Sequence, residues 1–227
     1  MKAMLLAAGR GERLRPLTEQ RPKALTPVGG KPLIQWHLER LAAAGCGEAV
    51  VNLSHLGEQL AAFLGDGARF GLRVRYSREA EPLETAGGIA QALPLLGAAS
   101  FLVVNADIYC EFDFSRLQGF SLQSNLAHLV LIPNPPHHPQ GDFSLRDAAV
   151  GNDTAPRYTY AGIAVMSPAL VAGVPPGAKA PLAPLLRAAA AEGRLSGERY
   201  ADRWQDVGTP EHLAALEKML ASDHGHR

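Results

Sequence analysis

The sequence predicts an α/β fold in which a mixed but mostly parallel sheet lies between two layers of helices. Two observations predict it. Short apolar runs that suit buried strands alternate with segments of helical periodicity through the first half of the chain, and such alternation is typical of βαβ units. The chain also has 227 residues, 47% of them hydrophobic, which is enough for a substantial core. We therefore expect a single domain spanning residues 1–227.

Four strands and three helices are expected in the first half. The first strand runs into a loop at Gly9–Pro16, and Pro32 suits the first turn of a helix that Gly45 and Gly47 end. Strands covered on both faces read as continuous apolar runs. The strands are expected at Ala3–Ala8, Ala49–Leu53, Leu72–Tyr76 and Phe101–Asn105, and the helices at Pro32–Leu41, Leu56–Leu64 and Ile89–Leu96.

The second half is less regular. Leu126–Ile132 is apolar enough for a central strand, and the four prolines of Pro133–Asp142 predict a loop because proline cannot donate to a strand ladder. Further strands are expected on either side of a turn at Gly151–Asn152. These strands are Phe143–Val150 and Tyr158–Met166, and two helices are expected at Pro181–Glu192 and Pro210–Ala221.

Charge and cysteine usage limit the classes of function. The 22 basic and 22 acidic residues give no net charge, which argues against a general nucleic-acid or membrane-surface binder. No apolar stretch approaches the roughly 20 residues that cross a bilayer. Cys46 and Cys110 have neither C-x-x-C nor metal-ligand spacing, so we expect free thiols in a cytoplasmic protein. A monomer and a small homo-oligomer both remain open.

The loop after the first strand is rich in glycine and in cationic residues. Gly9-Arg10-Gly11 suits backbone N–H groups that wrap a phosphate chain. The third glycine of a dinucleotide fingerprint and the Gly-Lys-Ser/Thr end of a P-loop are both missing. From the loop alone, a surface turn with solvated arginines is an equal alternative. The cationic residues that favour a polyanionic ligand are Arg10, Arg13, Arg15, Arg21 and Lys23.

The order G-x-G-x-R-L-x-P followed by P-K-x-L-x-P-V resembles the signature of the sugar-1-phosphate nucleotidyltransferases. This resemblance implies a Rossmann-like, GT-A-like three-layer sandwich, the fold of the nucleotide-diphospho-sugar transferases. It also implies that Arg13 and Lys23 are catalytic, with Lys23 near the reacting α-phosphate. By the same resemblance, the residues around the triphosphate are Gly9, Gly11, Glu12, Arg13 and Lys23.

The segment Glu79–Gly88 (EAEPLETAGG) follows the third expected strand, at the edge where open α/β sheets bind ligands. The resemblance implies that Glu79, Thr85 and Gly87 contact the nucleotide, with Glu79 at the Watson–Crick edge of the base. A carboxylate only accepts hydrogen bonds, so it selects the N3–H of uracil or the N1–H of guanine. Relatives often have glycine where this chain has Glu84, and its role is left open. An acidic solvated loop is the alternative.

Two acidic residues are candidates for a metal site. Asp107 follows a buried strand in Asn105-Ala106-Asp107, and Asp206 stands in WQDVGTP. The resemblance implies that both bind Mg²⁺, which prefers carboxylate, phosphate and water oxygens, and that Asp107 is catalytic. Taken alone, Asp206 reads as part of the turn before a helix that Thr209 caps. His137 and His138 are expected to be solvated, because no cysteine or acid lies near them at zinc spacing.

The sugar side carries the weakest signal. The E-K-P-like motif by which many relatives bind the sugar has no counterpart, which argues against recognition of glucose or mannose. The stretch Arg157–Val165 (RYTYAGIAV) takes its place, with Gly141-Asp142 before it. The predicted sugar contacts are Asn105, Gly141, Asp142 and Tyr160.

Within the family, EPLETAGGI, YAGIAV and WQDVGTPEHLAALE resemble the uridylyltransferases that act on N-acetylmuramic acid α-1-phosphate in peptidoglycan recycling. This implies UTP and a sugar 1-phosphate as substrates, with a nucleotide sugar and pyrophosphate as products. The predicted step is direct in-line attack, which positioning and charge neutralisation accelerate. The alternatives are a mannose- or heptose-1-phosphate guanylyltransferase and a non-catalytic nucleotide-sugar sensor.

Overall fold

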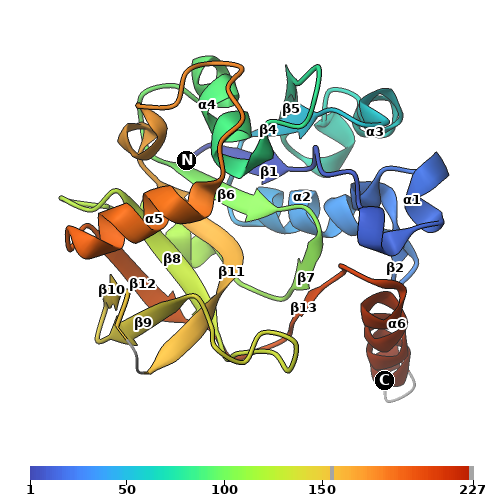
Figure 1. The fold of residues 1–227 in the computed structure, drawn as a ribbon. Coiled ribbons are helices and arrows are strands. Elements are labelled where there is room, and N and C mark those ends of the chain that lie inside the picture. Colours follow the sequence, from blue (N-terminus) through green and yellow to red (C-terminus); the bar gives the residue numbers. More distant parts are fainter. Residues whose placement is uncertain (154–155, 225–227) are drawn as a thin grey trace.

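The computed structural model describes residues 1–153 and 156–224, which form a nine-stranded mixed sheet flanked by helices (Figure 1). Within the described residues, seven strands of this sheet run in one direction, and β10 and β11 run in the other. In order across the sheet, the strands are β5 (Arg73–Arg78), β4 (Glu48–Leu53), β1 (Ala3–Leu6), β6 (Phe101–Asn105), β11 (Arg157–Met166), β8 (Ala127–Ile132), β12 (Leu195–Arg199), β10 (Ala149–Gly151) and β9 (Phe143–Arg146).

Helices cover both faces of the sheet. Successive side chains of a strand point to opposite faces, so Leu5 and Val51 pack into one buried cluster and Met4 and Val50 into the other. Helices α2 (Leu33–Ala43) and α3 (Gly57–Leu64) supply the first cluster, and α4 (Glu84–Leu96) and α5 (Leu182–Ala191) supply the second. The predicted three-layer α/β architecture is confirmed.

A third buried cluster joins the two ends of the chain. Helix α6 (Pro210–His224) packs Leu216 and Leu220 against Leu14 and Val28. Two small sheets lie beside it: β7 (Ile108–Cys110) pairs with β13 (Trp204–Asp206), and β2 (Pro27–Val28) pairs with β3 (Lys31–Pro32). The remaining helices are α1 (Leu17–Gln20) and the short 3₁₀ turns at Glu12–Leu14, Lys23–Leu25, Ala68–Phe70, Phe114–Leu117 and Pro168–Val171.

Three expectations about elements need correction. The expected strand Phe143–Val150 is a hairpin, β9–β10, that turns at Asp147, whose φ is +53°. Helix α4 begins at Glu84, five residues before the expected start, because a distant carbonyl, that of Ala180, accepts from the N–H groups of Ala86 and Gly87. Strands β7, β12 and β13 had no apolar pattern long enough to predict them. No helix of the described residues is long and apolar enough to cross a membrane.

Candidate active site

A cleft with three connected parts opens along the carboxyl ends of β1 and β6. We call these parts the inner pocket, the loop pocket and the α5 pocket. Lys23 and Gly9 line both the inner and the loop pockets, Thr85 and Asn105 line both the inner and the α5 pockets, and Glu84 lines all three. The cleft therefore offers one continuous path for an elongated ligand. Further lining residues are Ala7, Asn52, Glu79 and Asp107 in the inner pocket, Gly11, Glu12, Arg13, Lys179 and Gly208 in the loop pocket, and Asp142, Tyr160, Leu182 and Arg187 in the α5 pocket.

Gly9 and Gly11, which follow β1, contribute to the loop for different physical reasons. Gly11 has a φ of +64°, and a Cβ there would lie 2.8 Å from Thr18 Cγ2, so both the backbone conformation and the lack of space favour glycine. The Thr18 hydroxyl donates to the Gly11 carbonyl at 2.8 Å and holds the turn. At Gly9 the backbone is ordinary, and a Cβ would meet no protein atom within 4 Å. Gly9 thus leaves open space in the cleft that a close ligand can use.

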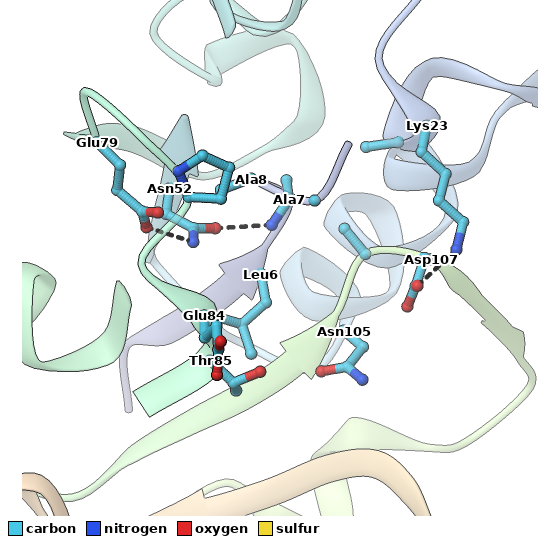
Figure 2. A pocket seen from close by; sticks show the side chains of 14 residues that line it. Leu6, Ala7, Ala8, Lys23, Asn52, Glu79, Glu84, Thr85, Asn105 and Asp107 are labelled. Carbon is cyan, nitrogen blue, oxygen red and sulfur yellow. Dashed lines mark hydrogen bonds and ion pairs between the residues drawn. The ribbon is translucent and has the colours of Figure 1, made fainter. Parts of the chain in front are cut away.

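Lys23 and Asp107 form an ion pair in the inner pocket (Figure 2). The ammonium Nζ lies 2.7 Å from Asp107 Oδ2, although the residues are 84 positions apart in the sequence. The Lys23 side chain is 11% exposed and that of Asp107 is 44% exposed. The carboxylate therefore keeps an open side toward the cleft while the ammonium is held in place.

The backbone of Asp206 lies next to that of Asp107, because β13 pairs with β7, which begins one residue after Asp107. In the β7–β13 ladder Asp206 is opposite Ile108, and the N–H of Val207 donates to the Asp107 carbonyl at 2.9 Å. A Cβ on Gly208 would lie 2.7 Å from Asp206 Oδ2 and 3.2 Å from Arg13 Nη2. Glycine at this position therefore lets Arg13 approach the same end of the cleft as the two aspartates.

A buried histidine supports β7 from behind. His37 of α2 is fully buried, and its Nε2 lies 2.7 Å from the carbonyl oxygen of Ile108. Because a carbonyl only accepts, Nε2 carries the proton and Nδ1, which has no partner among the described residues, does not. Burial lowers the pKa of His37 from 6.5 to about 4, so the imidazole is neutral at physiological pH.

Glu79 belongs to a chain of hydrogen bonds on the far side of the inner pocket (Figure 2). Its Oε1 accepts from Asn52 Nδ2 at 2.7 Å, and its Oε2 accepts from the Leu83 N–H at 2.9 Å. Asn52 Oδ1 in turn accepts from the Ala7 N–H at 2.7 Å. Glu79 is only 5% exposed, and each of its oxygens keeps a free lone pair for a ligand.

The start of α4 shows why small residues recur in this segment. Glu84 has a φ of +61°, a conformation that costs an L-residue about 1–2 kcal/mol and that glycine adopts freely. Gly88 leaves room for the Glu79–Asn52 contact, since a Cβ there would lie 2.7 Å from Glu79 Oε1. Gly87 packs against the segment that precedes α5, because a Cβ there would come 2.3 Å from the Ala178 carbonyl oxygen. The Gly87 N–H donates to the Ala180 carbonyl.

The predicted sugar residues separate into two groups. Asn105, Asp142 and Tyr160 line the α5 pocket. Asp142 is fixed, because its Oδ2 accepts from the Tyr160 N–H at 2.8 Å and its Oδ1 lies 3.0 Å from His138 Nε2. The buried Tyr160 hydroxyl has no hydrogen-bond partner within the described residues. Gly141 instead forms the turn, with a φ of +62° and Asn134 Oδ1 only 2.6 Å from where its Cβ would be.

A bulge in β11 places Asn105 in the cleft. The register against β8 shifts between Tyr160 and Ala164, and Gly162 within this stretch has a φ of +76°. A Cβ on Gly162 would lie 2.7 Å from Asn105 Nδ2, so the bulge leaves space for that side chain. The Ala161 carbonyl, displaced from the ladder, accepts from the Trp204 indole at 2.9 Å. Bulges of this kind are common beside active sites.

Sequence reasoning missed three residues of the cleft. Asn52 is a polar residue inside the apolar run VVNL, and that interruption was the available signal. Gly88 could not be assigned a role without knowing that Glu79 and Asn52 meet beside it. Lys179 lines the loop pocket from the segment before α5, and no local pattern in that segment marks it.

The fold and the sequence define the class of protein. Residues 2–145 match the profile of the family described as Nucleotidyl transferase, and the chain belongs to this family. A crystal structure described as a glucose-1-phosphate thymidylyltransferase from Bacillus anthracis superposes with a TM-score of 0.84 over 97% of this chain and 95% of that one, at 20% identity. This likeness shows a shared fold.

The particular relatives include two N-acetylmuramate α-1-phosphate uridylyltransferases. The one from Neisseria meningitidis serogroup B is 50% identical, with 98% of this chain and 99% of the relative covered. The one from Caulobacter vibrioides is 35% identical, with 96% of each chain covered. The mannose-1-phosphate guanylyltransferase of Mycobacterium tuberculosis is 31% identical, with 99% of this chain and 68% of that protein covered.

Proposed function

We propose that this protein transfers a uridylyl group from UTP to N-acetylmuramic acid α-1-phosphate, giving the UDP-sugar and pyrophosphate. One observation carries the proposal. Lys23, Arg13 and Asp107 line connected pockets of one cleft beside the glycine loop. Asp206 borders this cleft, since a Cβ on Gly208 would lie close to both Asp206 Oδ2 and Arg13 Nη2. The full-length likeness to the Neisseria uridylyltransferase supplies the choice of nucleotide and sugar.

The nucleotide side of the proposal uses the inner and loop pockets. Backbone groups of Gly9 and Gly11, together with Glu12, Arg13 and Lys23, surround the triphosphate, and Lys179, which lines the same pocket, adds positive charge. The free lone pairs of Glu79 accept the N3–H of uracil, and Thr85 lies beside the base. Gly87 stays a proposed nucleotide contact through atoms other than its N–H, which donates to the Ala180 carbonyl.

Asp107 and Asp206 form the proposed metal site. The donors fit Mg²⁺, since two carboxylates, one directly before β7 and one at the end of the neighbouring β13, offer the oxygen ligands that this ion prefers. Asp107 and Asp206 would hold the ion, and Lys23, which pairs with Asp107 Oδ2 at 2.7 Å, would keep the Asp107 carboxylate in place. When bound, Mg²⁺ supplies positive charge that neutralises phosphate oxygens and aligns them.

The proposed chemistry is a single displacement. A phosphate oxygen of the sugar 1-phosphate forms a bond to the α-phosphorus of UTP while the bond from that phosphorus to the bridging oxygen breaks, and pyrophosphate leaves. Lys23 stabilises charge at the α-phosphate, and Arg13 stabilises charge on the leaving pyrophosphate. The rigid cleft holds the two substrates in line, which removes much of the entropic part of the barrier.

The sugar 1-phosphate is proposed to enter the α5 pocket. Asn105, Asp142 and the unpaired Tyr160 hydroxyl offer hydrogen bonds to the sugar, and Leu182 and Leu186 offer an apolar wall. Arg187 lies at the same pocket, where its guanidinium suits the lactyl carboxylate of muramic acid. The free, buried thiols of Cys46 and Cys110 agree with a cytoplasmic location, where peptidoglycan recycling would use this reaction.

Pyrophosphate release across a substrate panel tests the proposal. UTP or GTP is combined with N-acetylmuramic acid, N-acetylglucosamine, glucose or mannose 1-phosphate, with and without Mg²⁺. We expect the highest kcat/KM for UTP with N-acetylmuramic acid α-1-phosphate, and no turnover without the metal. A preference for GTP with mannose 1-phosphate would identify a guanylyltransferase, and nucleotide binding without turnover would identify a sensor. Either result contradicts the proposal.

A further inference from the structure

Three metal-ligating side chains from distant segments meet beside β13. His137 comes from the loop between β8 and β9, Asp206 ends β13, and His212 lies in the first turn of α6. Their ligand atoms all lie within 4.8 Å of one another. Figure 1 shows that the β8–β9 loop extends from the far half of the sheet to β13. From the sequence, His137 is expected to be solvated, with no acid near it at zinc spacing. The fold, however, brings Asp206 beside it.

The distances suit a shared cation. His212 Nδ1 lies 3.0 Å from Asp206 Oδ2, and His137 Nε2 lies 3.6 Å from Asp206 Oδ1. Zinc–ligand bonds of about 2.0–2.1 Å place neighbouring ligand atoms of a tetrahedral ion roughly 3.3 Å apart. The two imidazole rings are 4.8 Å apart between centroids and tilted by 35°, so small rotations bring both nitrogens to one ion.

We infer that His137, Asp206 and His212 form a binding site for a divalent transition-metal ion such as Zn²⁺ or Co²⁺. Two imidazoles and one carboxylate suit these ions, whereas Mg²⁺ prefers oxygen ligands. The side chains are 44%, 21% and 24% exposed, respectively, so an ion can enter and keep a water ligand. This site is distinct from the proposed Asp107–Asp206 magnesium site, with which it shares one carboxylate.

The ion would join two parts of the cleft. It ties the β8–β9 loop to β13 and α6, and the same loop carries His138 and Asp142, whose contact faces the α5 pocket. It also engages Asp206, so Zn²⁺ is expected to inhibit magnesium-dependent turnover. Metal binding itself does not rest on the proposed reaction, since the three ligands are present whether or not the protein turns over.

Cobalt titration tests the site directly. The untagged, full-length protein, freed of metal by a chelator, is titrated with Co²⁺ while visible absorption is recorded. We expect one ion to bind with the intense bands of a four- or five-coordinate site. In His137→Gln and His212→Gln, we expect affinity to fall at least tenfold. His55→Gln serves as the surface control, and the double variant His224→Gln/His226→Gln removes the imidazoles of the tail.

Several outcomes would overturn the inference. A three-ligand site is rejected if the affinity for Co²⁺ is equal in all variants, or if it falls in only one of His137→Gln and His212→Gln. A loss of Co²⁺ binding in the tail variant would also reject it. Thermal unfolding in the presence of chelator confirms that every variant is folded. A second arm measures Zn²⁺ inhibition of pyrophosphate release, which His137→Gln should relieve. Absence of turnover would reject the proposed function and leave the cobalt result to stand separately.

Discussion

The two halves of the cleft differ in how their polar side chains are paired. We call them the nucleotide half and the sugar half, after the ligands proposed for them. In the nucleotide half, built on β1, β4, β5 and β6, the polar groups already pair with one another: Lys23 with Asp107, and Glu79 with Asn52. In the sugar half, built on β8 to β12 and α5, the Tyr160 hydroxyl is buried with no partner among the described residues. The comparison indicates that the nucleotide half is held by contacts between its own polar groups, whereas the sugar half keeps a buried, unpaired hydroxyl, which we propose that the substrate engages.

The strongest test breaks the ion pair of the nucleotide half. Lys23→Ala and Asp107→Ala should each lower kcat by about 10²–10³-fold, because charge stabilisation in a preorganised site is lost. Since the two groups are 2.7 Å apart, the double variant should lose much less than the product of the single losses. Steady-state pyrophosphate release measures the effect. The control is Lys31→Ala, since Lys31 lies over the Trp36 ring; near-wild-type kcat in either single variant would remove that residue from the mechanism.

Acid should lower the free energy of unfolding through His37, which supports β7 beside the nucleotide half. Its folded pKa of about 4 lies below the unfolded value of 6.5, so only the unfolded chain binds a proton between these values. The stability from neutral His37 is thus complete above pH 6.5 and declines as the pH falls toward 4, by about 3 kcal/mol in total. Urea unfolding over this pH range measures the loss. His37→Gln keeps a donor for Ile108 without titrating, and a decline as steep as in the wild type would contradict the assignment.

Replacement of Asn52 should weaken the binding of UTP and leave the binding of the sugar 1-phosphate unchanged. Asn52→Leu leaves the Ala7 N–H and Glu79 Oε1 unpaired, and an unpaired buried polar group costs about 1–3 kcal/mol. We expect the KM for UTP to rise about tenfold and the KM for the sugar 1-phosphate to stay unchanged. Gln91→Leu, at a position of α4 that bonds the Arg78 carbonyl, is the matched control. Equal increases in both KM values would mean that the two halves are not prepared separately.

The smallest effect is expected at Tyr160. Tyr160→Phe removes a hydroxyl that has no hydrogen-bond partner in the part of the chain that the structure describes, so the free protein should keep its stability. If the sugar 1-phosphate pairs with this hydroxyl, its KM should rise about fivefold, the value of one hydrogen bond of about 1 kcal/mol, while the KM for UTP stays constant. Steady-state kinetics with each substrate varied in turn measures both. A stability loss with unchanged KM would show that the hydroxyl serves the fold instead.

The elements that the sequence predicts well are those whose signal is local. Phe101–Asn105 is a strand with the predicted bounds, because its first four residues are a continuous apolar run that is fully buried. Helices α2 and α5 lie within a few residues of their predicted limits, since proline begins each pattern. The signal for the glycine loop at Gly9–Pro16 and its arginines is also local, and Gly11 has the positive φ expected in such a loop.

The sequence by itself determined the layered α/β fold, the glycine loop after β1 and the residue types of the cleft, because apolar periodicity and short motifs depend on neighbours along the chain. The tertiary structure alone decided which of those residues meet. Asp107 and Asp206 are joined by the pairing of two three-residue strands, α4 starts early because Ala180 accepts its first N–H groups, and His137 reaches Asp206 and His212 through a loop. Contacts between distant segments are set by how whole elements pack, and no local pattern records them.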